Sequence, residues 1–395
     1  MSAQLSSLTS ETNGQPAVPS LLGELLGVCI AQAASDLHLV PDHPPYLRIQ
    51  GVLEEQVAMP PLSEPQLDQL AEELMRPWDR AALDRTGSFD GAISGPNGVR
   101  FRFNLFRRQN QLAISMRRLE DRFRSLTELG LPEHLYQLCD LPDGLVLVCG
   151  PTGSGKTTTL AALLDRINRT RRCHIVTIED PIEYLHPPMK SLVNQRQLGI
   201  DTSSFNDALV ASMRQDPDVI LVGEIRDLAT IRTAITAAET GHLVFTTVHA
   251  GDCVGAIERL VAVFPADEQP GVRRQLALVL RAIVAQHLLI ADGSVDRKAA
   301  EGGQPRRHRV VTSEVLRGTP AVANLIVAAK SNQIYSAMET GAAEGMQTLE
   351  QDLARLWVAH RISEATATMM ARNPAVMRDR AALLRKPARV EGGRR

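Results

Sequence analysis

The sequence is poor in aromatic residues and has no surplus of positive charge. Aromatic side chains make up 4% of its 395 residues, which leaves few rings on which nucleic-acid bases could stack. Lys and Arg number 43 and Asp and Glu 45, so the chain lacks the cationic excess of a protein that coats polyanions. Both features argue against general nucleic-acid binding, and we expect no nucleic-acid partner.

The chain also lacks paired cysteines and long hydrophobic runs. Its cysteine count of 5 is odd and includes no Cys-x-x-Cys pair, which argues against a disulfide framework or a zinc knuckle. The N-terminal segment has neither the basic nor the apolar region of a secretory signal. No apolar run reaches the ~18–20 residues of a membrane span. We expect a cytoplasmic protein without a membrane span, with peripheral attachment at the inner face of the cytoplasmic membrane left open.

Composition and periodicity divide the chain into two domains and three flanking segments. Residues 1–19 and 381–395 have the polar, Pro- and Gly-containing composition of flexible tails. Between the tails we expect an α+β domain over 20–119, an α/β domain over 120–318 and a helical region over 319–380. The polar stretch 292–308 is expected to be an exposed loop.

The α+β domain is predicted to contain a helix over 21–34, a strand over 45–53 and a hairpin over 98–119 with its turn at Gln109–Asn110. In the hairpin, aromatic and aliphatic side chains alternate with Arg100, Arg102 and Asn104, so one face is apolar and the other basic. The pattern alone favours a solvated sheet face for these arginines.

The α/β domain shows short apolar runs that alternate with helical segments. Such runs are typical of parallel strands covered on both faces. The predicted strands are 145–149, 174–178, 219–222 and 243–248, and the predicted helices follow Lys156 and lie near 205–213 and 228–239.

The strongest motif is G-x-x-x-x-G-K-[ST], which starts directly after the first of these strands. Its glycines allow the backbone to wrap around a phosphate, and the helix that follows adds partial positive charge. Lys156 would contact the β- and γ-phosphates, and the Thr157 hydroxyl would ligate Mg²⁺. The alternative is a chance Gly-rich turn. The residues predicted to bind nucleotide here are Gly150, Pro151, Thr152, Gly153, Ser154, Gly155, Lys156, Thr157 and Thr158.

Acidic residues follow two of the other strands. Glu179, Asp180 and Glu183 follow the second strand, where a carboxylate can orient and deprotonate the attacking water. Glu224 follows the third strand after Gly223, in the form of a Walker B acid, and would hold Mg²⁺ partly through water. The alternatives are an ordinary acidic loop for the first group and a helix-terminal acid for Glu224.

Two histidines, His242 and His249, bracket the fourth strand. Spacing alone favours structural histidines. The alternative is that they sense the γ-phosphate or a neighbouring subunit.

With these blocks in order, the sequence resembles the secretion ATPase superfamily and, more narrowly, the PilT-like ATPases of type IV pilus retraction and twitching motility. The resemblance runs from Ser20 to about Pro374. The strings that carry it are ASDLHL (34–39), GPTGSGKTTTLAALLD (150–165), IVTIEDPIEYLH (175–186), LVNQRQLG (192–199), MRQDPDVILVGEIRDLATIRTAITAAETGHLVFTTVHA (213–250), VFPADE (263–268) and TGAAEGMQTLEQDL (340–353).

The resemblance implies roles that spacing does not assign. Glu183 matches the catalytic glutamate of the family's Asp box, Glu224 its Walker B glutamate, and His242 and His249 its His box. The remaining implied site residues are Glu179 and Asp180 at the nucleotide and Arg102 and Arg117, which lie where the family's first domain supplies arginines to a nucleotide.

The resemblance also implies an architecture and partners. It implies a PAS-like first domain, a RecA-like P-loop domain with a helical C-terminal extension, and a homohexameric ring. The ring would hydrolyse ATP with Mg²⁺ and act on an inner-membrane pilus platform protein, with a paralogous pilus ATPase as a further partner.

Two departures bear on the branch of the family. The chain lacks the four-cysteine zinc element of assembly and type II secretion relatives, which favours retraction. However, Ala323 replaces an arginine, and Ala328 with Ala329 stands near the place of an acid, in a helix linked to retraction within the family. Pilus assembly, type II secretion, an accessory ring partner without strong activity of its own, and a DNA-translocating ATPase therefore stay open as alternatives.

Overall fold

The computed structural model describes residues 20–49, 51–76, 79–119, 122–292 and 309–385. They form two compact units, Met1–Arg118 and Leu119–Arg395, each of which is described by itself. The predicted tail 1–19 and nearly all of the predicted loop 292–308 lie outside the described residues. The predicted tail 381–395 is wrong at its start, because helix α14 (Pro374–Arg385) continues to Arg385 with Ala381 buried.

The first unit is an antiparallel sheet covered by helices. Its six strands lie in the order β3-β2-β1-β6-β5-β4. Phe101, Phe103 and Leu105 of β5 point into the core with the apolar faces of α1 and α2. The elements are α1 (Leu21–Ala31), β1 (Asp36–Leu39), β2 (Tyr46–Ile49), β3 (Val52–Glu55), α2 (Glu64–Leu74), α3 (Arg80–Thr86), β4 (Ser88–Ser94), η1 (Pro96–Gly98), β5 (Arg100–Arg108) and β6 (Gln111–Arg118).

Two sequence predictions for this unit meet different outcomes. The hairpin is confirmed as β5 and β6, with its turn at Gln109 and Asn110, which both have positive φ. The single strand predicted over 45–53 is wrong. Gly51, at φ 90°, reverses the chain there, so the segment forms the antiparallel pair β2 and β3.

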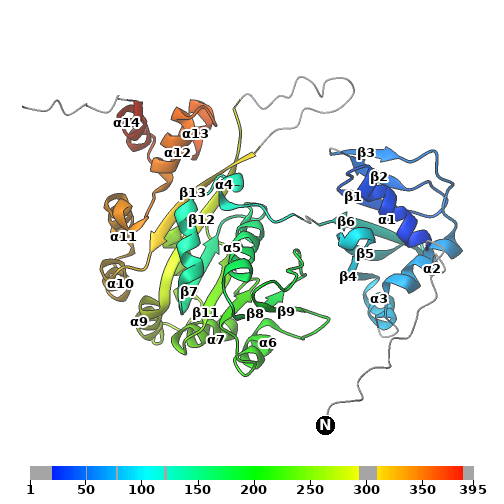
Figure 1. Cartoon of the computed structure of the whole chain (residues 1–395), viewed down its shortest axis with the longest axis horizontal. Coiled ribbons are helices and arrows are strands. Elements are labelled where there is room, and N and C mark those ends of the chain that lie inside the picture. Colours follow the sequence, from blue (N-terminus) through cyan, green and yellow to red (C-terminus); the bar gives the residue numbers. More distant parts are fainter. Residues whose placement is uncertain (1–19, 50, 77–78, 120–121, 293–308, 386–395) are drawn as a thin grey trace, which may run out of the picture. The chain divides into compact units, whose positions relative to one another are not determined.

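The second unit is built on a seven-stranded sheet in the order β13-β12-β7-β11-β10-β8-β9 (Figure 1). All neighbouring pairs are parallel except the pair of β12 with β13. The elements up to the last strand are α4 (Leu126–Leu129), η2 (Glu133–Asp140), β7 (Gly144–Cys149), α5 (Lys156–Thr170), β8 (His174–Glu179), β9 (Leu192–Gln197), α6 (Phe205–Ser212), β10 (Val219–Val222), α7 (Leu228–Glu239), β11 (Leu243–Val248), α8 (Cys253–Ala262), α9 (Gln269–Val279), β12 (Leu280–Ile290) and β13 (Arg309–Arg317).

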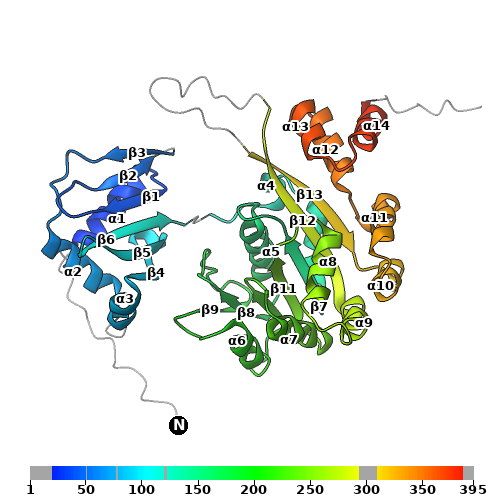
Figure 2. The same ribbon diagram turned by 180° about the vertical axis from the view of Figure 1, so that it is seen from behind.

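Helices cover this sheet on both faces (Figure 2). Alternate residues of the fully buried strand β7 enter different cores: Leu145 and Leu147 pack with α6 to α9, and Val146 and Val148 pack with α5. This confirms the mixed α/β class. The helical region that follows contains α10 (Pro320–Val327), α11 (Ser331–Thr340), η4 (Gly341–Glu344), α12 (Leu349–Val358), α13 (Glu364–Met370) and α14.

None of the helices in the described parts of the chain combines the length and apolar character needed to cross a bilayer. The longest, α5, has 15 residues and begins with a lysine.

Candidate nucleotide-binding site

The Gly-rich loop 150–155 connects the carboxyl end of β7 to the first turn of α5. Gly150 has φ 148°, and a Cβ there would lie 2.3 Å from the backbone oxygen of Gln286 in β12. Gly155 is the N-cap residue of α5 and has a left-handed backbone conformation, with φ 94°. Because a side chain is excluded at Gly150 and strained at Gly155, the sequence can form this loop only with glycine at these positions.

The Lys156 side chain binds back to the start of the Gly-rich loop. Its Nζ donates to the backbone oxygens of Gly150 and Pro151, at 3.0 and 3.1 Å. Burial lowers the pKa of Lys156, and the nearby carboxylate of Glu224 opposes that shift. A cation with little water around it and only neutral acceptors is suited to bind an anion.

A second buried group fits an anion in the same loop. Among the residues that the structure describes, the Ser154 Oγ has no hydrogen-bond partner although Ser154 is 2% exposed. A buried hydroxyl without a partner is costly, so a phosphate oxygen that accepts its proton would stabilise it. The loop therefore has the donors that a triphosphate requires.

Thr157 and Thr158 occupy the first turn of α5. The hydroxyl of Tyr184 donates to the Thr158 Oγ1 at 3.4 Å. Thr158 is thus tied to the acidic segment that follows β8, while Thr157 remains the proposed metal ligand. This contact joins the start of α5 to the loop that contains Glu183.

Glu179 ends β8 and is 7% exposed. Burial raises the pKa of its carboxyl group, although Thr177 and Gln195 donate hydrogen bonds to its Oε1, at 2.6 and 3.1 Å. The backbone N–H of Glu183 also bonds to this carboxylate. Glu179 therefore supports the segment internally, and the half-buried Glu183 and the exposed Asp180 are the acids that solvent can reach.

Glu224 and His249 follow the neighbouring strands β10 and β11, and the structure brings them together. The His249 Nε2 lies 3.4 Å from the Glu224 Oε2, and the Arg226 Nη2 lies 2.6 Å from the Oε1. The backbone N–H of Ile225 donates to the Thr247 oxygen at 3.2 Å, which holds the two strand ends side by side. Glu224, His249 and the Gly-rich loop thus share one edge of the sheet.

His242 lies at the opposite edge. It precedes β11, where its backbone oxygen accepts from the N–H of Gly144 at the start of β7. Its Nδ1 lies 2.9 Å from the Ala237 oxygen. Since ~23 Å of extended strand separates His242 from His249, the prediction that His242 binds the nucleotide of its own chain is not supported. The sequence already placed the two histidines at opposite ends of one strand, and the parallel pairing of β11 with β7 shows which end lies beside the Gly-rich loop.

Arg102 and Arg117 belong to the first unit and face each other across β5 and β6. The Arg117 Nε donates to the Asp36 Oδ1 at 2.8 Å, and the Arg48 Nε lies 3.6 Å from the Oδ2. Burial of Asp36 raises its pKa, but hydrogen bonds from Arg117 and Ser35 outweigh burial and lower it. The sheet face is therefore organised around an ion pair, and a nucleotide role for the two arginines stays a prediction.

The donors near the loop suit a metal that arrives with its nucleotide. In the described part of the chain, no group of three or more His, Cys, Asp and Glu could hold a metal by itself. Mg²⁺ commonly takes one or two protein ligands and completes its shell with phosphate oxygens and water. Thr157 and Glu224 fit that pattern.

Sequence reasoning missed two glutamines on β9. Gln195 and Gln197 contact the loop 180–186 that follows β8. The strand itself was not predicted, because LVNQRQ is polar and lacks the apolar run used to find the others. A Gln-x-Gln spacing on a strand, which places both amides on one face, was the available signal.

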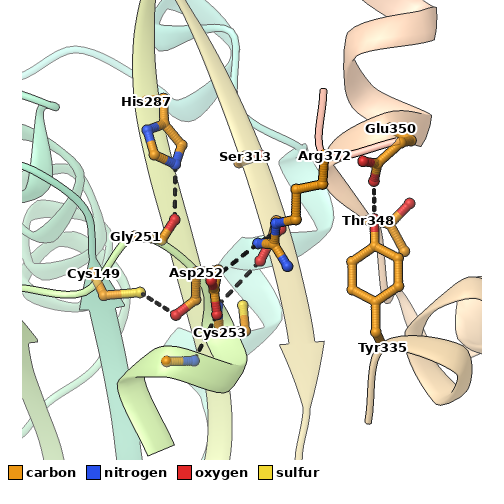
Figure 3. Close-up of polar contacts among 12 residues, drawn as sticks. Cys149, Gly251, Asp252, Cys253, His287, Ser313, Tyr335, Thr348, Glu350 and Arg372 are labelled. Carbon is orange, nitrogen blue, oxygen red and sulfur yellow. Dashed lines mark hydrogen bonds and ion pairs between the residues drawn. The ribbon is translucent and has the colours of Figure 1, made fainter. Parts of the chain in front are cut away.

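Sequence reasoning also missed how the loop after His249 is held (Figure 3). Arg372, between α13 and α14, lies 3.4 Å from the Asp252 carboxylate and pairs with Glu314 of β13. The Cys253 N–H donates to the other Glu314 oxygen at 3.1 Å. Burial raises the pKa of Glu314 to about 7. The C-terminal helices are thereby tied to the loop that leaves the nucleotide edge.

Residues 11–371 match the family model of the Type II/IV secretion system protein. The type IV pilus retraction ATPase PilT of Pseudomonas aeruginosa is 43% identical over 89% of this chain and 98% of its own. A twitching motility protein of Neisseria gonorrhoeae is 41% identical over 84% and 86%. A type II secretion system protein E of P. aeruginosa is 39% identical, but over 61% of this chain and 49% of its own.

Solved structures show the same similarity to pilus and related ATPases. The crystal structure of the pilus retraction motor PilT with bound ADP has a TM-score of 0.80, with 40% identity over 89% of this chain and 97% of its own. The ATPase DotB of Legionella pneumophila has a TM-score of 0.76, with 25% identity over 89% and 95%. Together with the nucleotide edge described above, these similarities show that the chain belongs to the type II/IV secretion system protein family of ATPases.

Proposed function

We propose that this chain is a P-loop ATPase whose hydrolysis of Mg-ATP powers type IV pilus retraction, and hence twitching motility. The observation that carries the proposal is the single sheet edge that holds the closed Gly-rich loop with Lys156 and the acids of the two neighbouring segments. The full-length similarity to retraction ATPases supports the direction of movement.

In the proposed reaction, Lys156 exchanges its contacts with loop oxygens for contacts with the β- and γ-phosphates. The Ser154 hydroxyl donates to a phosphate oxygen. Glu183 orients a water molecule and accepts its proton as the water oxygen attacks the γ-phosphorus, and the bond to the β-phosphate oxygen breaks to leave ADP and phosphate. Thr157 and, through water, Glu224 would hold Mg²⁺, which would neutralise charge on the phosphates when bound.

The proposal includes further roles. Arg102, Arg117 and His249 are proposed to respond to the phosphates, and Asp180 to line the site. The chain is proposed to act in the cytoplasm as a homohexameric ring, in which one subunit contributes to its neighbour's site. It would act on an inner-membrane platform protein, with a paralogous pilus ATPase as a further partner. Loss of the γ-phosphate would release a domain closure and produce movement.

Complementation of a deletion strain with a Lys156→Ala variant tests the direction of the motor. If the chain retracts pili, the variant leaves excess surface pili that do not retract, and wild type restores normal numbers. Absent pili would instead indicate assembly, and unchanged pili with a secretion defect would indicate type II secretion. Nucleotide binding by the purified chain without turnover would indicate a scaffolding ring partner, and salt-sensitive stimulation by DNA a translocase.

A further inference from the structure

The polar strand β9 lies at the edge of the sheet, parallel to β8. Its register pairs Gln195 with Thr177 and Gln197 with Glu179. Side chains two residues apart on a strand share a face, so the two glutamines lie on the same face as Thr177 and Glu179. Asn194 points to the other face, where its Nδ2 lies 2.8 Å from the His174 Nε2.

Gln195 uses both N–H donors of its amide and accepts one hydrogen bond at its oxygen. Its Nε2 donates to the Glu179 Oε1 at 3.1 Å and to the Tyr184 backbone oxygen at 2.8 Å. Its Oε1 accepts from the backbone N–H of His186 at 2.8 Å. One side chain therefore connects the end of β8 with two peptide groups of the following loop.

The same loop is held on both sides of Glu183. The backbone N–H of Ile182 donates to the Gln197 Oε1 at 3.4 Å, and the Tyr184 oxygen accepts from Gln195. The N–H of Glu183 itself bonds to the Glu179 carboxylate that Gln195 contacts. The backbone that aims the Glu183 side chain is thus fixed at three consecutive residues, with Tyr184 held directly by Gln195 and Glu183 held by the Glu179 carboxylate that Gln195 contacts.

We propose that Gln195 is a positioning residue that holds the loop 182–186 so that Glu183 faces the water that attacks ATP. The proposal rests on the function proposed above. Gln195 touches neither substrate nor metal in this account. It acts through Glu179, Tyr184 and His186.

The chemistry of the site explains why a glutamine is required. The Glu179 carboxylate and the Tyr184 oxygen each need a donor, and the His186 N–H needs an acceptor. A neutral primary amide supplies two donors and an acceptor. A carboxylate at this position would lose both donors and lie beside the buried Glu179, whose own hydrogen bonds come from the neutral groups Thr177, Gln195 and the Glu183 N–H. An aliphatic side chain would leave the Tyr184 oxygen and the His186 N–H without this partner.

The decisive variant is Gln195→Glu, with Asn194→Asp as its matched control on the opposite face. We expect Gln195→Glu to lower kcat at pH 8.5 at least tenfold, with KM for ATP within twofold of wild type. As the pH falls to 6, the ratio of wild-type to variant kcat should shrink at least threefold, because a proton shared between the two carboxyl groups restores a donor. Gln195 contacts the titratable carboxylate of Glu179 and the backbone of Tyr184 and His186, and the charge of Glu183 acts on Glu179 from nearby.

Hydrogen exchange gives a second measurement that does not need turnover. Gln195→Leu should speed amide exchange in a peptide covering 180–186 at least tenfold, while Asn194→Asp leaves it unchanged and both variants keep the wild-type unfolding midpoint within a few degrees. Unchanged exchange, a Gln195→Glu kcat within twofold of wild type, or a kcat ratio that does not vary with pH would overturn the proposal. If wild type bound ATP without hydrolysing it, the ATPase proposal would fail while exchange still decided the role of Gln195.

Discussion

Two loops that leave the same sheet edge are held by different chemistry. The loop after β8 is held by the amide cluster, which consists of Gln195 and Gln197 with backbone groups of 182–186. The loop after β11 is held by the ion cluster, which consists of Asp252, Glu314 and Arg372. The first cluster is neutral, although Gln195 also contacts the Glu179 carboxylate, and the second combines two acids with one cation.

The difference matches what each loop is proposed to do. Neutral amides hold a loop with little dependence on pH or salt, which suits a segment that must aim Glu183. An ion cluster responds to the charges around it. That suits a junction between the nucleotide edge and helices that end at Arg385 of α14, 133 residues after Asp252. The ion cluster contains Glu314, whose pKa is strongly raised, and the loop after β8 contains His186, whose pKa is strongly lowered, so the two shifts change stability in opposite directions with pH.

The largest expected effect is a fall in kcat when Glu183, in the loop after β8, is changed. Glu183→Gln should lower kcat by about 10²–10⁴, because a general base contributes on that order. ATP binding and the free energy of unfolding should stay near wild type, since the amide cluster remains intact. Steady-state turnover and equilibrium ATP binding check this, with Glu344→Gln on the exposed surface as the matched control. A variant that hydrolyses ATP at the normal rate would remove Glu183 from the mechanism.

The next effect concerns the ion cluster. Burial raises the pKa of Glu314 to about 7 in the folded state, against Arg372 and with help from the charges of Asp252 and Glu350. The folded chain therefore binds more protons than the unfolded chain between pH 4.5 and 7, and stability falls as pH rises through that window. At ~1.4 kcal/mol per unit, the loss is on the order of 3 kcal/mol.

Glu314→Gln should flatten this dependence. Urea unfolding of wild type and variant at pH 5.5 and pH 8 measures it, with Glu364→Gln on the exposed pair with Arg378 as the control. Parallel pH profiles for wild type and Glu314→Gln would show that Glu314 keeps an ordinary carboxyl pKa in the folded state.

The smallest expected effect is a loss of stability on acidification, opposite in its pH dependence to that of Glu314, and it arises in the loop after β8. The ring of His186 lies tilted by 38° against that of Phe123, with 4.7 Å between the ring centroids. Burial lowers the pKa of its imidazole to about 4 against the attraction of Asp165. The unfolded chain then binds more protons between pH 4 and 6.5, so stability falls as the solution is acidified. Between pH 6.5 and 5 the loss is roughly 2 kcal/mol.

His186→Gln should remove this acid-dependent loss. The same urea unfolding series, extended to pH 5, provides the measurement, and His174→Gln at the start of β8 serves as the control. If His186→Gln and wild type lost equal stability on acidification, the neutral histidine would play no part in holding the loop.

Much of the nucleotide edge could be predicted because its signals are local in sequence. The run LVLVC followed by the Gly-rich motif defines a strand, a loop and a helix within a short segment, and the structure has all three. The order of the apolar runs likewise predicted β8, β10 and β11. These elements depend on contiguous residues with a clear period.

The supports of the edge could not be predicted in the same way. Glu314 and Arg372 lie 58 residues apart, and nothing local in either segment indicates that they meet. Gln195 reaches Glu179 across two strands whose pairing appears only in the fold. His242 and His249 bracket one predicted strand, and the parallel pairing of β11 with β7 shows that His249 lies at the nucleotide edge and His242 does not.

The most direct test is a titration of the purified, folded chain with Mg-ATP, with Lys156→Ala as the comparison. Wild type should bind Mg-ATP saturably and release phosphate, and removal of the Lys156 ammonium should lower turnover at least a hundredfold. Wild-type protein that stays folded yet binds no Mg-ATP, or a Lys156→Ala variant that hydrolyses it at the wild-type rate, would contradict the account.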